Sequence, residues 1–127
     1  MEARFNIADR KRAVIHRALF RAIKIAVLGK GYDLCLVITT PSRMKKLNTV
    51  YRDKEKPTDI LSFPISKNEG EIYLCPAEAR KEAKRFGREY ADFLAFLFIH
   101  GCVHLKGYDH GSTMESIEAK FRRKFKV

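Results

Sequence analysis

Long apolar runs are missing from this sequence of 127 residues. The longest uninterrupted run, residues 93–99, is far shorter than the ~20 residues that a membrane-spanning helix needs. Residues 1–12, MEARFNIADRKR, carry charges with no apolar stretch behind them, which argues against a secretory signal peptide. These absences predict a soluble, cytoplasmic protein that does not bind a membrane.

Cysteine is scarce and scattered. Cys35, Cys75 and Cys102 are an odd number of thiols and include no CxxC pair. This pattern speaks against a disulfide framework and against a cysteine-based zinc site. We expect the three side chains to be buried as small apolar residues in a reducing compartment.

Acidic residues are few relative to basic ones. The sequence has 15 Asp and Glu against 26 Lys and Arg, which gives a formal net charge of +11. Such an excess does not bear on the fold, but it favours polyanionic partners, because basic side chains displace the counterions condensed on nucleic acid. A solvated basic exterior without a partner remains the alternative.

Repeats, low-complexity segments and linkers are also absent, so residues 1–127 are expected to form one domain. Apolar periodicity and turn residues predict strands over residues 4–7, 34–39, 60–63 and 71–74. They predict helices over residues 11–28, 41–47, 76–86 and 90–106, and a last helix opened by a capping box at Ser112 and Glu115. Residues 51–58 are predicted to be a loop. Strands and helices mix without strict alternation, which favours an α+β fold with a small sheet.

The first predicted helix allows a more detailed expectation. Asp9 or a neighbour is expected to cap it, because Asp accepts hydrogen bonds from the free N–H groups of a first turn. Val14, Ala18, Ala22 and Ala26 recur every four residues and are expected to lie on one face. His16 is expected at the surface of this helix.

Histidine is concentrated in one segment, HGCVHLKGYDH. His100 and His104 are four residues apart on a predicted helix, so their side chains share a face about 6 Å apart along the axis. Gly107 permits a sharp turn after the helix, which can bring His110 back to the same point. Three neutral imidazoles and a water would hold a tetrahedral zinc ion with one open position. The spacing therefore predicts one Zn²⁺, or another divalent transition metal, at His100, His104 and His110.

This histidine spacing is also that of the metzincin proteases, which carry Glu directly after the first His as general base. Gly101 stands at that position here, which argues against a peptidase. Glycine inside a helix costs ~1 kcal/mol relative to alanine. Either a substrate or a packed neighbour is therefore expected to come close to the backbone at Gly101.

Three segments resemble one protein family. HGCVHLKGYDH resembles the HGxLHLxGYDH signature of the YbeY family of bacterial endoribonucleases. LNTVYRDKEKPTDILSFP, residues 47–64, resembles that family's LNxxYRxxxxPTDVLSFP segment, and GEIYLCP resembles its GDIxI strand. Together these segments cover most of residues 34–111 in the expected order. Val103 stands where the family usually has Leu, which exchanges one apolar side chain for another.

The resemblance implies a zinc-dependent, single-strand-specific endoribonuclease that acts in small-subunit (16S) ribosomal RNA maturation and ribosome quality control. It implies an α+β fold in which the metal helix packs beside a small mixed sheet. The metal ligands would fall on His100, His104 and His110, and the family's functional arginine on Arg52. A guanidinium can hold a phosphate bidentately while negative charge develops on it, so Arg52 is expected to face the metal from a loop. Thr58 and Ser62 are further candidates for RNA binding.

A second function of a different class stays open from the sequence. The chain could be a ribosome-assembly factor that binds RNA or ribosomal protein and uses zinc only structurally. An open coordination position would favour the enzyme, and four protein ligands would favour the binding protein. In both cases the expected partners are single-stranded ribosomal RNA and the ribosome or its small subunit.

Overall fold

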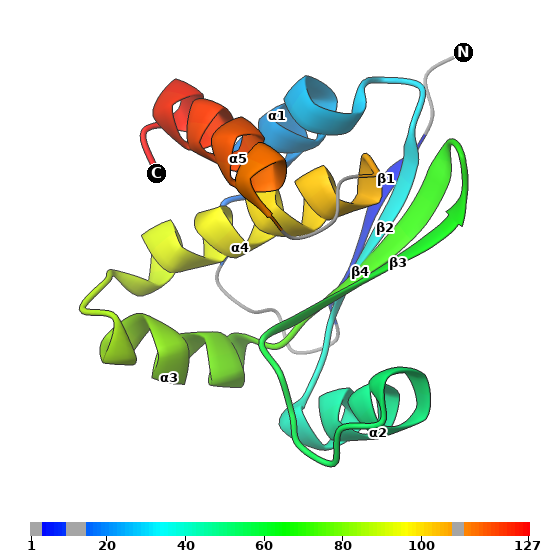
Figure 1. The fold of residues 1–127 in the computed structure, drawn as a ribbon, viewed down its shortest axis with the longest axis vertical. Helices are drawn as coiled ribbons and strands as arrows, with labels where there is room; N and C mark the ends of the chain where they lie inside the picture. The colour runs from blue at the N-terminus through cyan, green and yellow to red at the C-terminus, as the bar shows by residue number, and fades with distance from the viewer. Residues whose placement is uncertain (1–3, 10–14, 108–110) are drawn as a thin grey trace.

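The computed structural model describes residues 4–9, 15–107 and 111–127. Within these residues the chain forms a four-stranded sheet and five helices (Figure 1). In chain order the elements are β1 (Phe5–Asp9), α1 (Arg17–Leu28), β2 (Asp33–Ile38), α2 (Pro41–Arg52), β3 (Ile60–Ser66), β4 (Glu69–Leu74), α3 (Pro76–Arg85), α4 (Tyr90–Leu105) and α5 (Ser112–Phe125).

The sheet is mixed, with the strand order β1-β2-β4-β3. β1 and β4 pair with β2 in parallel, whereas β3 pairs with β4 as an antiparallel edge strand. The predicted strand over residues 4–7 is confirmed as the opposite edge, with Phe5 paired with Leu34. The α+β class with a small mixed sheet is thereby confirmed.

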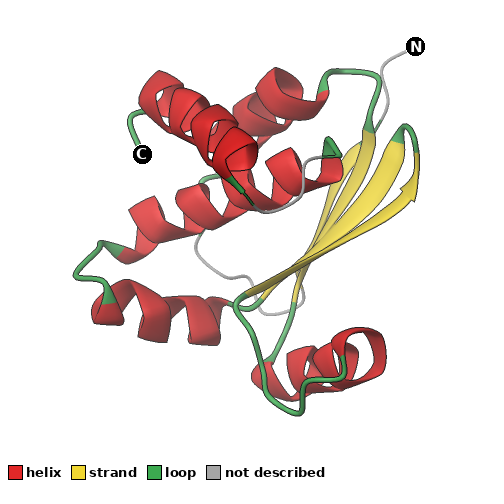
Figure 2. Ribbon diagram, viewed as in Figure 1, coloured by secondary structure: helices red, strands yellow, loops and turns green. Residues whose placement is uncertain are grey.

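Helices cover the two faces of the sheet unequally, as Figure 2 shows. α1 and α4 pack on one face around the main core, and α5 packs on α4. Residues of β4 alternate between the faces, so Ile72 joins the main core while Tyr73 points to the other side. On that second side α2 packs against β3 through a smaller cluster around Met44 and Leu61.

α4 is buried on nearly every side, as its apolar sequence predicts. Between residues 93 and 105 the side chains that stay half-buried are spaced by four: Phe96, His100 and His104. A helix repeats every 3.6 residues, so these three form one stripe along α4. The spacing that indicated a metal site therefore also marks the side of α4 that the core leaves uncovered.

The start of α1 differs from the expectation. The predicted start at residue 11 lies outside the described residues, and the described helix begins at Arg17. Its cap is His16, whose Nδ1 accepts a hydrogen bond from the N–H of Leu19 at 3.0 Å. The prediction that Asp9 caps this helix was wrong, because Asp9 belongs to β1. His16 is exposed, as expected.

The face of α1 that carries the alanine repeat is not the face that packs into the core. Phe20, Ile23 and Val27 point into the core, while Ala18 and Ala22 are exposed. Burial free energy scales with the apolar area removed from water, so the larger side chains decide how the helix is turned. The alanine side chains carry little apolar area, so they do not decide which face of the helix is buried.

The predicted capping box at the start of α5 was wrong as well. Ser112 is already the first helical residue, and no side chain caps this helix within the described chain. The N–H of Glu115 bonds to the carbonyl oxygen of Gly111 at 3.0 Å, so the Ser112 hydroxyl is not needed there.

The cysteines follow the expectation in part. All three thiols are free, and Cys75 and Cys102 are buried. Cys35 is only half-buried, because alternate residues of β2 point away from the main core.

Within the described part of the chain, no helix combines the length and the apolar character needed to cross a bilayer.

Candidate functional site

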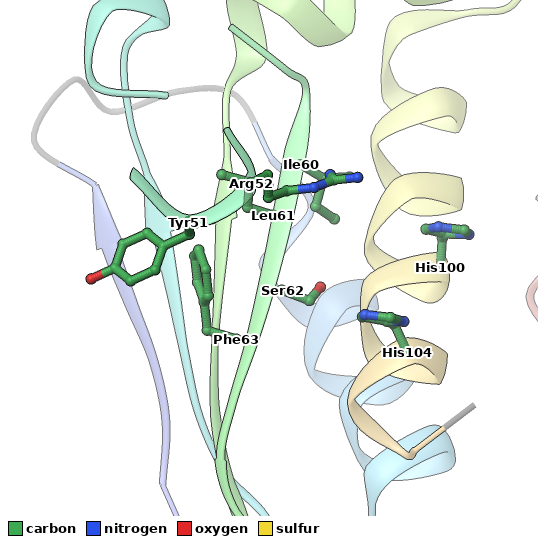
Figure 3. A pocket seen from close by; sticks show the side chains of 8 residues that line it. All are labelled: Tyr51, Arg52, Ile60, Leu61, Ser62, Phe63, His100 and His104. Carbon is green, nitrogen blue, oxygen red and sulfur yellow. The ribbon is translucent and has the colours of Figure 1, made fainter. Parts of the chain in front are cut away.

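A pocket of about 350 Å³ lies where α2, β3 and α4 meet (Figure 3). α2 contributes Tyr51 and Arg52, β3 contributes residues 60–63, and α4 contributes His100 and His104. α4 is far from α2 and β3 in the sequence, and the edge position of β3 leaves room for α2 and α4 to meet around it. The pocket thus brings together three of the four residues that were predicted to be catalytic.

The fourth predicted residue, His110, lies outside the described residues. The described part of α4 ends at Leu105, and Gly107 adopts a φ of 108°, which confirms the predicted turn there. Within residues 4–9, 15–107 and 111–127, no group of three or more His, Cys, Asp or Glu side chains is arranged to hold a metal ion. Of the predicted ligand set, the structure therefore describes His100 and His104, and the metal site stays a prediction.

His100 is held by a partner that the sequence did not reveal. Its Nδ1 atom lies 2.5 Å from Oε1 of Glu118, which α5 carries. A carboxylate oxygen accepts hydrogen bonds, so this contact favours the tautomer of His100 that carries its proton on Nδ1. Glu118 follows Met114 by four residues on the buried face of α5. The signal available in the sequence was an acidic residue on the apolar stripe of α5.

Arg52 is the last residue of α2, so the prediction of a loop there was wrong. α2 continues past residue 47 because no glycine or proline interrupts it, and it ends where Asp53 takes the left-handed conformation with a φ of 54°. The side chain of Arg52 extends across the edge of β3 toward α4 (Figure 3).

The loop after Arg52 is tied back to α2. The buried side chain of Asn48 donates a hydrogen bond from Nδ2 to the carbonyl oxygen of Lys56 at 2.9 Å. The hydroxyl of Thr49 lies 3.3 Å from the carbonyl oxygen of Lys54. Sequence reasoning did not identify Asn48, although it belongs to the segment that resembles the family motif. These bonds hold the helix end from which Arg52 projects.

Gly101 permits close packing of α4 on β3. A Cβ atom built there would lie 2.9 Å from Cδ1 of Ile60 and 3.0 Å from Oγ of Ser62. Of the two explanations left open by the sequence, a packed neighbour is therefore the one observed. A larger side chain at this position would collide with these residues of β3.

The two residues proposed for RNA binding besides Arg52 differ in position. Ser62 lines the pocket, and its hydroxyl donates to the carbonyl oxygen of Gly101 at 3.4 Å. Thr58 is half-buried in the loop before β3 and is not among the residues that line the pocket.

An aromatic row borders the pocket on its α2 side. The rings of Tyr51 and Phe63 meet edge to face with centroids 5.0 Å apart, and Phe63 meets Tyr73 in the same way at 5.7 Å. The side chain of Tyr51 is 64% exposed. Tyr51 and Phe63 were not singled out in the sequence, although alternation along β3 places Phe63 on the side opposite α4.

One carboxyl group near the pocket has a shifted pKa. Burial raises the pKa of Asp59, and the negative charge of Glu82 raises it further. Hydrogen bonds from the backbone N–H groups of Asp59 and Ile60 act in the opposite direction.

Comparison with known proteins gives one family. The model of the family described as "Endoribonuclease YbeY" matches residues 2–125. An endoribonuclease YbeY of Nautilia profundicola is 38% identical over 92 residues, which are 69% of this chain and 66% of that protein. That of Sulfurimonas denitrificans is 35% identical over 120 residues, which are 89% of this chain and 85% of that protein. A solution structure of a Thermotoga maritima protein matches with a TM-score of 0.68 and 25% identity, covering 96% of this chain and 89% of that chain. The chain belongs to the YbeY endoribonuclease family.

Proposed function

We propose that this protein is a zinc-dependent, single-strand-specific endoribonuclease that acts in small-subunit (16S) ribosomal RNA maturation and ribosome quality control. The ribosome or its small subunit would be its partner, and the cytoplasm its location. The observation that carries the proposal is the pocket in which Arg52 of α2 extends toward the helix that bears His100 and His104.

The residues of the pocket suit a metal ion. His100 and His104 lie one helical turn apart on the uncovered stripe of α4, and Glu118 bonds to His100 at Nδ1. With His110 they would hold one Zn²⁺, or another divalent transition metal. When bound, the ion would supply Lewis acidity and a water molecule that is nucleophilic at neutral pH.

Arg52 would bind the phosphate. Its guanidinium presents paired donors that match two phosphate oxygens, and these bonds strengthen as negative charge develops during attack. The hydrogen bonds of Asn48 and Thr49 limit the movement of the helix end that carries it. Such fixed positioning lowers the entropy cost of reaching the reactive geometry.

Tyr51 would contribute the preference for single strands. Its exposed ring borders the pocket next to Arg52, where an unpaired base could stack on it. A duplex keeps its bases stacked inside the helix and offers no free face to such a ring. The net charge of +11 would add attraction to any RNA backbone without regard to sequence.

Metal analysis of the purified protein and single-turnover cleavage of a single-stranded RNA, before and after chelation, test this proposal. Arg52→Ala should retain metal and fold but lower the cleavage rate by ~10²–10³, as loss of one transition-state donor does in other enzymes. Arg52→Lys should restore little, because it keeps the charge and loses the bidentate geometry. His104→Ala should lose stoichiometric metal.

Arg43→Ala is the matched control, because it removes the same charge from an exposed position on the same helix. It should cleave at nearly the wild-type rate. A wild-type rate in Arg52→Ala would contradict the role of Arg52. Stoichiometric zinc and tight RNA binding without any cleavage would favour the non-catalytic assembly factor.

A further inference from the structure

Glu118 is a charged residue in an apolar interface. Its exposed fraction is 9%, and it lies where α5 packs on α4. Its neighbour Glu115, one turn earlier on α5, is exposed. A buried carboxylate is strongly unfavourable unless it is paired and hydrogen-bonded, so the partner of Glu118 is what makes this position acceptable.

That partner is His100, which Glu118 contacts at one of the two ring nitrogens. Glu118 Oε1 contacts Nδ1 at 2.5 Å, while the ring itself lines the pocket. Nδ1 and Nε2 are distinct atoms on the ring, and a hydrogen bond at one of them determines which atom carries the proton. The ring of Phe96 packs beside His100 with centroids 6.4 Å apart. Tautomer and orientation of His100 are therefore both constrained from outside the pocket.

We propose that Glu118 is a positioning residue of the metal centre, which holds His100 with Nε2 directed to the ion. This inference rests on the proposed metal-dependent function. Carboxylates that accept a hydrogen bond from a ligating histidine orient the ring and raise its basicity, and their loss typically weakens metal binding 10- to 100-fold. α5 would thereby be part of the metal centre, although it lines no part of the described pocket.

The competing explanation is that Glu118 only joins α5 to α4. Two substitutions separate the explanations. Glu118→Gln keeps the size and one acceptor oxygen but removes the charge, and Glu118→Met replaces the group with an apolar side chain of similar length. Replacing a buried ion pair by a well-packed apolar group is often neutral or stabilising, whereas a ligating histidine without its carboxylate loses orientation. Glu115→Gln is the control, since it removes the same charge from an exposed position on the same helix.

The experiment measures Zn²⁺ affinity of the full-length chain by competition with a chromophoric chelator, together with urea unfolding of the metal-free protein. Nitrogen-15 chemical shifts of the His100 ring in the metal-free protein report its tautomer. We expect 10- to 100-fold weaker Zn²⁺ binding in Glu118→Met and a smaller loss in Glu118→Gln. We also expect a change from the Nδ1–H tautomer to a mixture in both variants, and wild-type behaviour in Glu115→Gln.

The outcomes are distinct for the two proposals. A wild-type protein that binds no Zn²⁺ overturns the proposed metal function and, with it, this inference. A wild-type protein that binds Zn²⁺, with equal affinity and an unchanged tautomer in the Glu118 variants, overturns only the role of Glu118. If Glu118→Met fails to fold, Glu118→Gln still decides, because it retains the shape and a hydrogen-bond acceptor.

Discussion

Substituting Gly101 by alanine tests the packing of α4 on the sheet. The added Cβ would lie 2.9 Å from Ile60 Cδ1, 3.0 Å from Ser62 Oγ and 3.1 Å from Ile72 Cδ1. Optimal contacts between carbon atoms are about 3.5–4.0 Å. Each neighbour must therefore retreat by roughly half an ångström at that contact distance. All three belong to strands that the core holds in place, so the adjustment falls on side-chain torsions or on α4 itself.

The expected magnitude follows from two opposing effects. Inserting a methyl group into a packed interface costs about 1–3 kcal/mol. Replacing glycine by alanine inside a helix returns about 1 kcal/mol. The free energy of unfolding should therefore fall by about 1 kcal/mol, which for a chain of this size corresponds to a Tm decrease of about 4 °C.

Urea unfolding measures this difference, and two further variants sharpen it. Gly31→Ala is the control, because nothing lies within 4 Å of a Cβ there and its φ is not positive. Ile60→Val removes the closest Cδ1, so the double variant Gly101→Ala/Ile60→Val should lose about 0.5–1 kcal/mol less than the sum of the single changes. If Gly101→Ala were as stable as the wild type or more stable, close packing would not explain the glycine.

Three other outcomes are expected. Binding to single-stranded RNA should weaken steeply with salt, with a log–log slope of about −0.7 per phosphate contact; an affinity that stays flat in a salt titration would show that the basic surface does not bind RNA. Burial raises the folded-state pKa of Asp59 above its ordinary value of 3.8. Between the unfolded-state and the folded-state pKa the folded chain binds more protons than the unfolded chain, so the stability of the protein falls as pH rises through this range. Asp59→Asn should accordingly be more stable than the wild type at pH 7 but not at pH 3, and urea unfolding at both pH values measures this difference. A variant that is more stable at pH 3 and not at pH 7 would contradict the raised pKa. In the folded protein Cys35 should react with Ellman's reagent well before Cys75 and Cys102, which are buried; equal rates for all three would mean that the core opens readily.

Most of the secondary structure could be predicted from the sequence, because its signals are local. The apolar run before His100 and the four-residue spacing to His104 depend only on neighbours within a turn or two. They identified α4 and placed His100 and His104 on one face of it. The alternating strands and the segment around Arg52 were likewise found from short patterns. The same patterns identified the family.

The remaining features depend on which surfaces the folded chain buries. α1 turns its Phe and Ile into the core because they carry more apolar area than the alanines that repeat beside them. Arg52 belongs to a helix because Asn48 and Asp53 determine where α2 ends, and neither residue is a strong signal by itself. Gly101 is explained only by the strand that packs on it.

The contact between His100 and Glu118 shows most clearly what could not be predicted from the sequence. The two residues are 18 positions apart on different helices, and no periodicity links them. They meet because α5 buries its apolar stripe on α4, which brings a carboxylate to the outer edge of the imidazole. Local sequence therefore identified Arg52, His100 and His104, whereas only the packing of the helices decided which side chains surround and hold them, since the area buried between elements is a property of the whole fold.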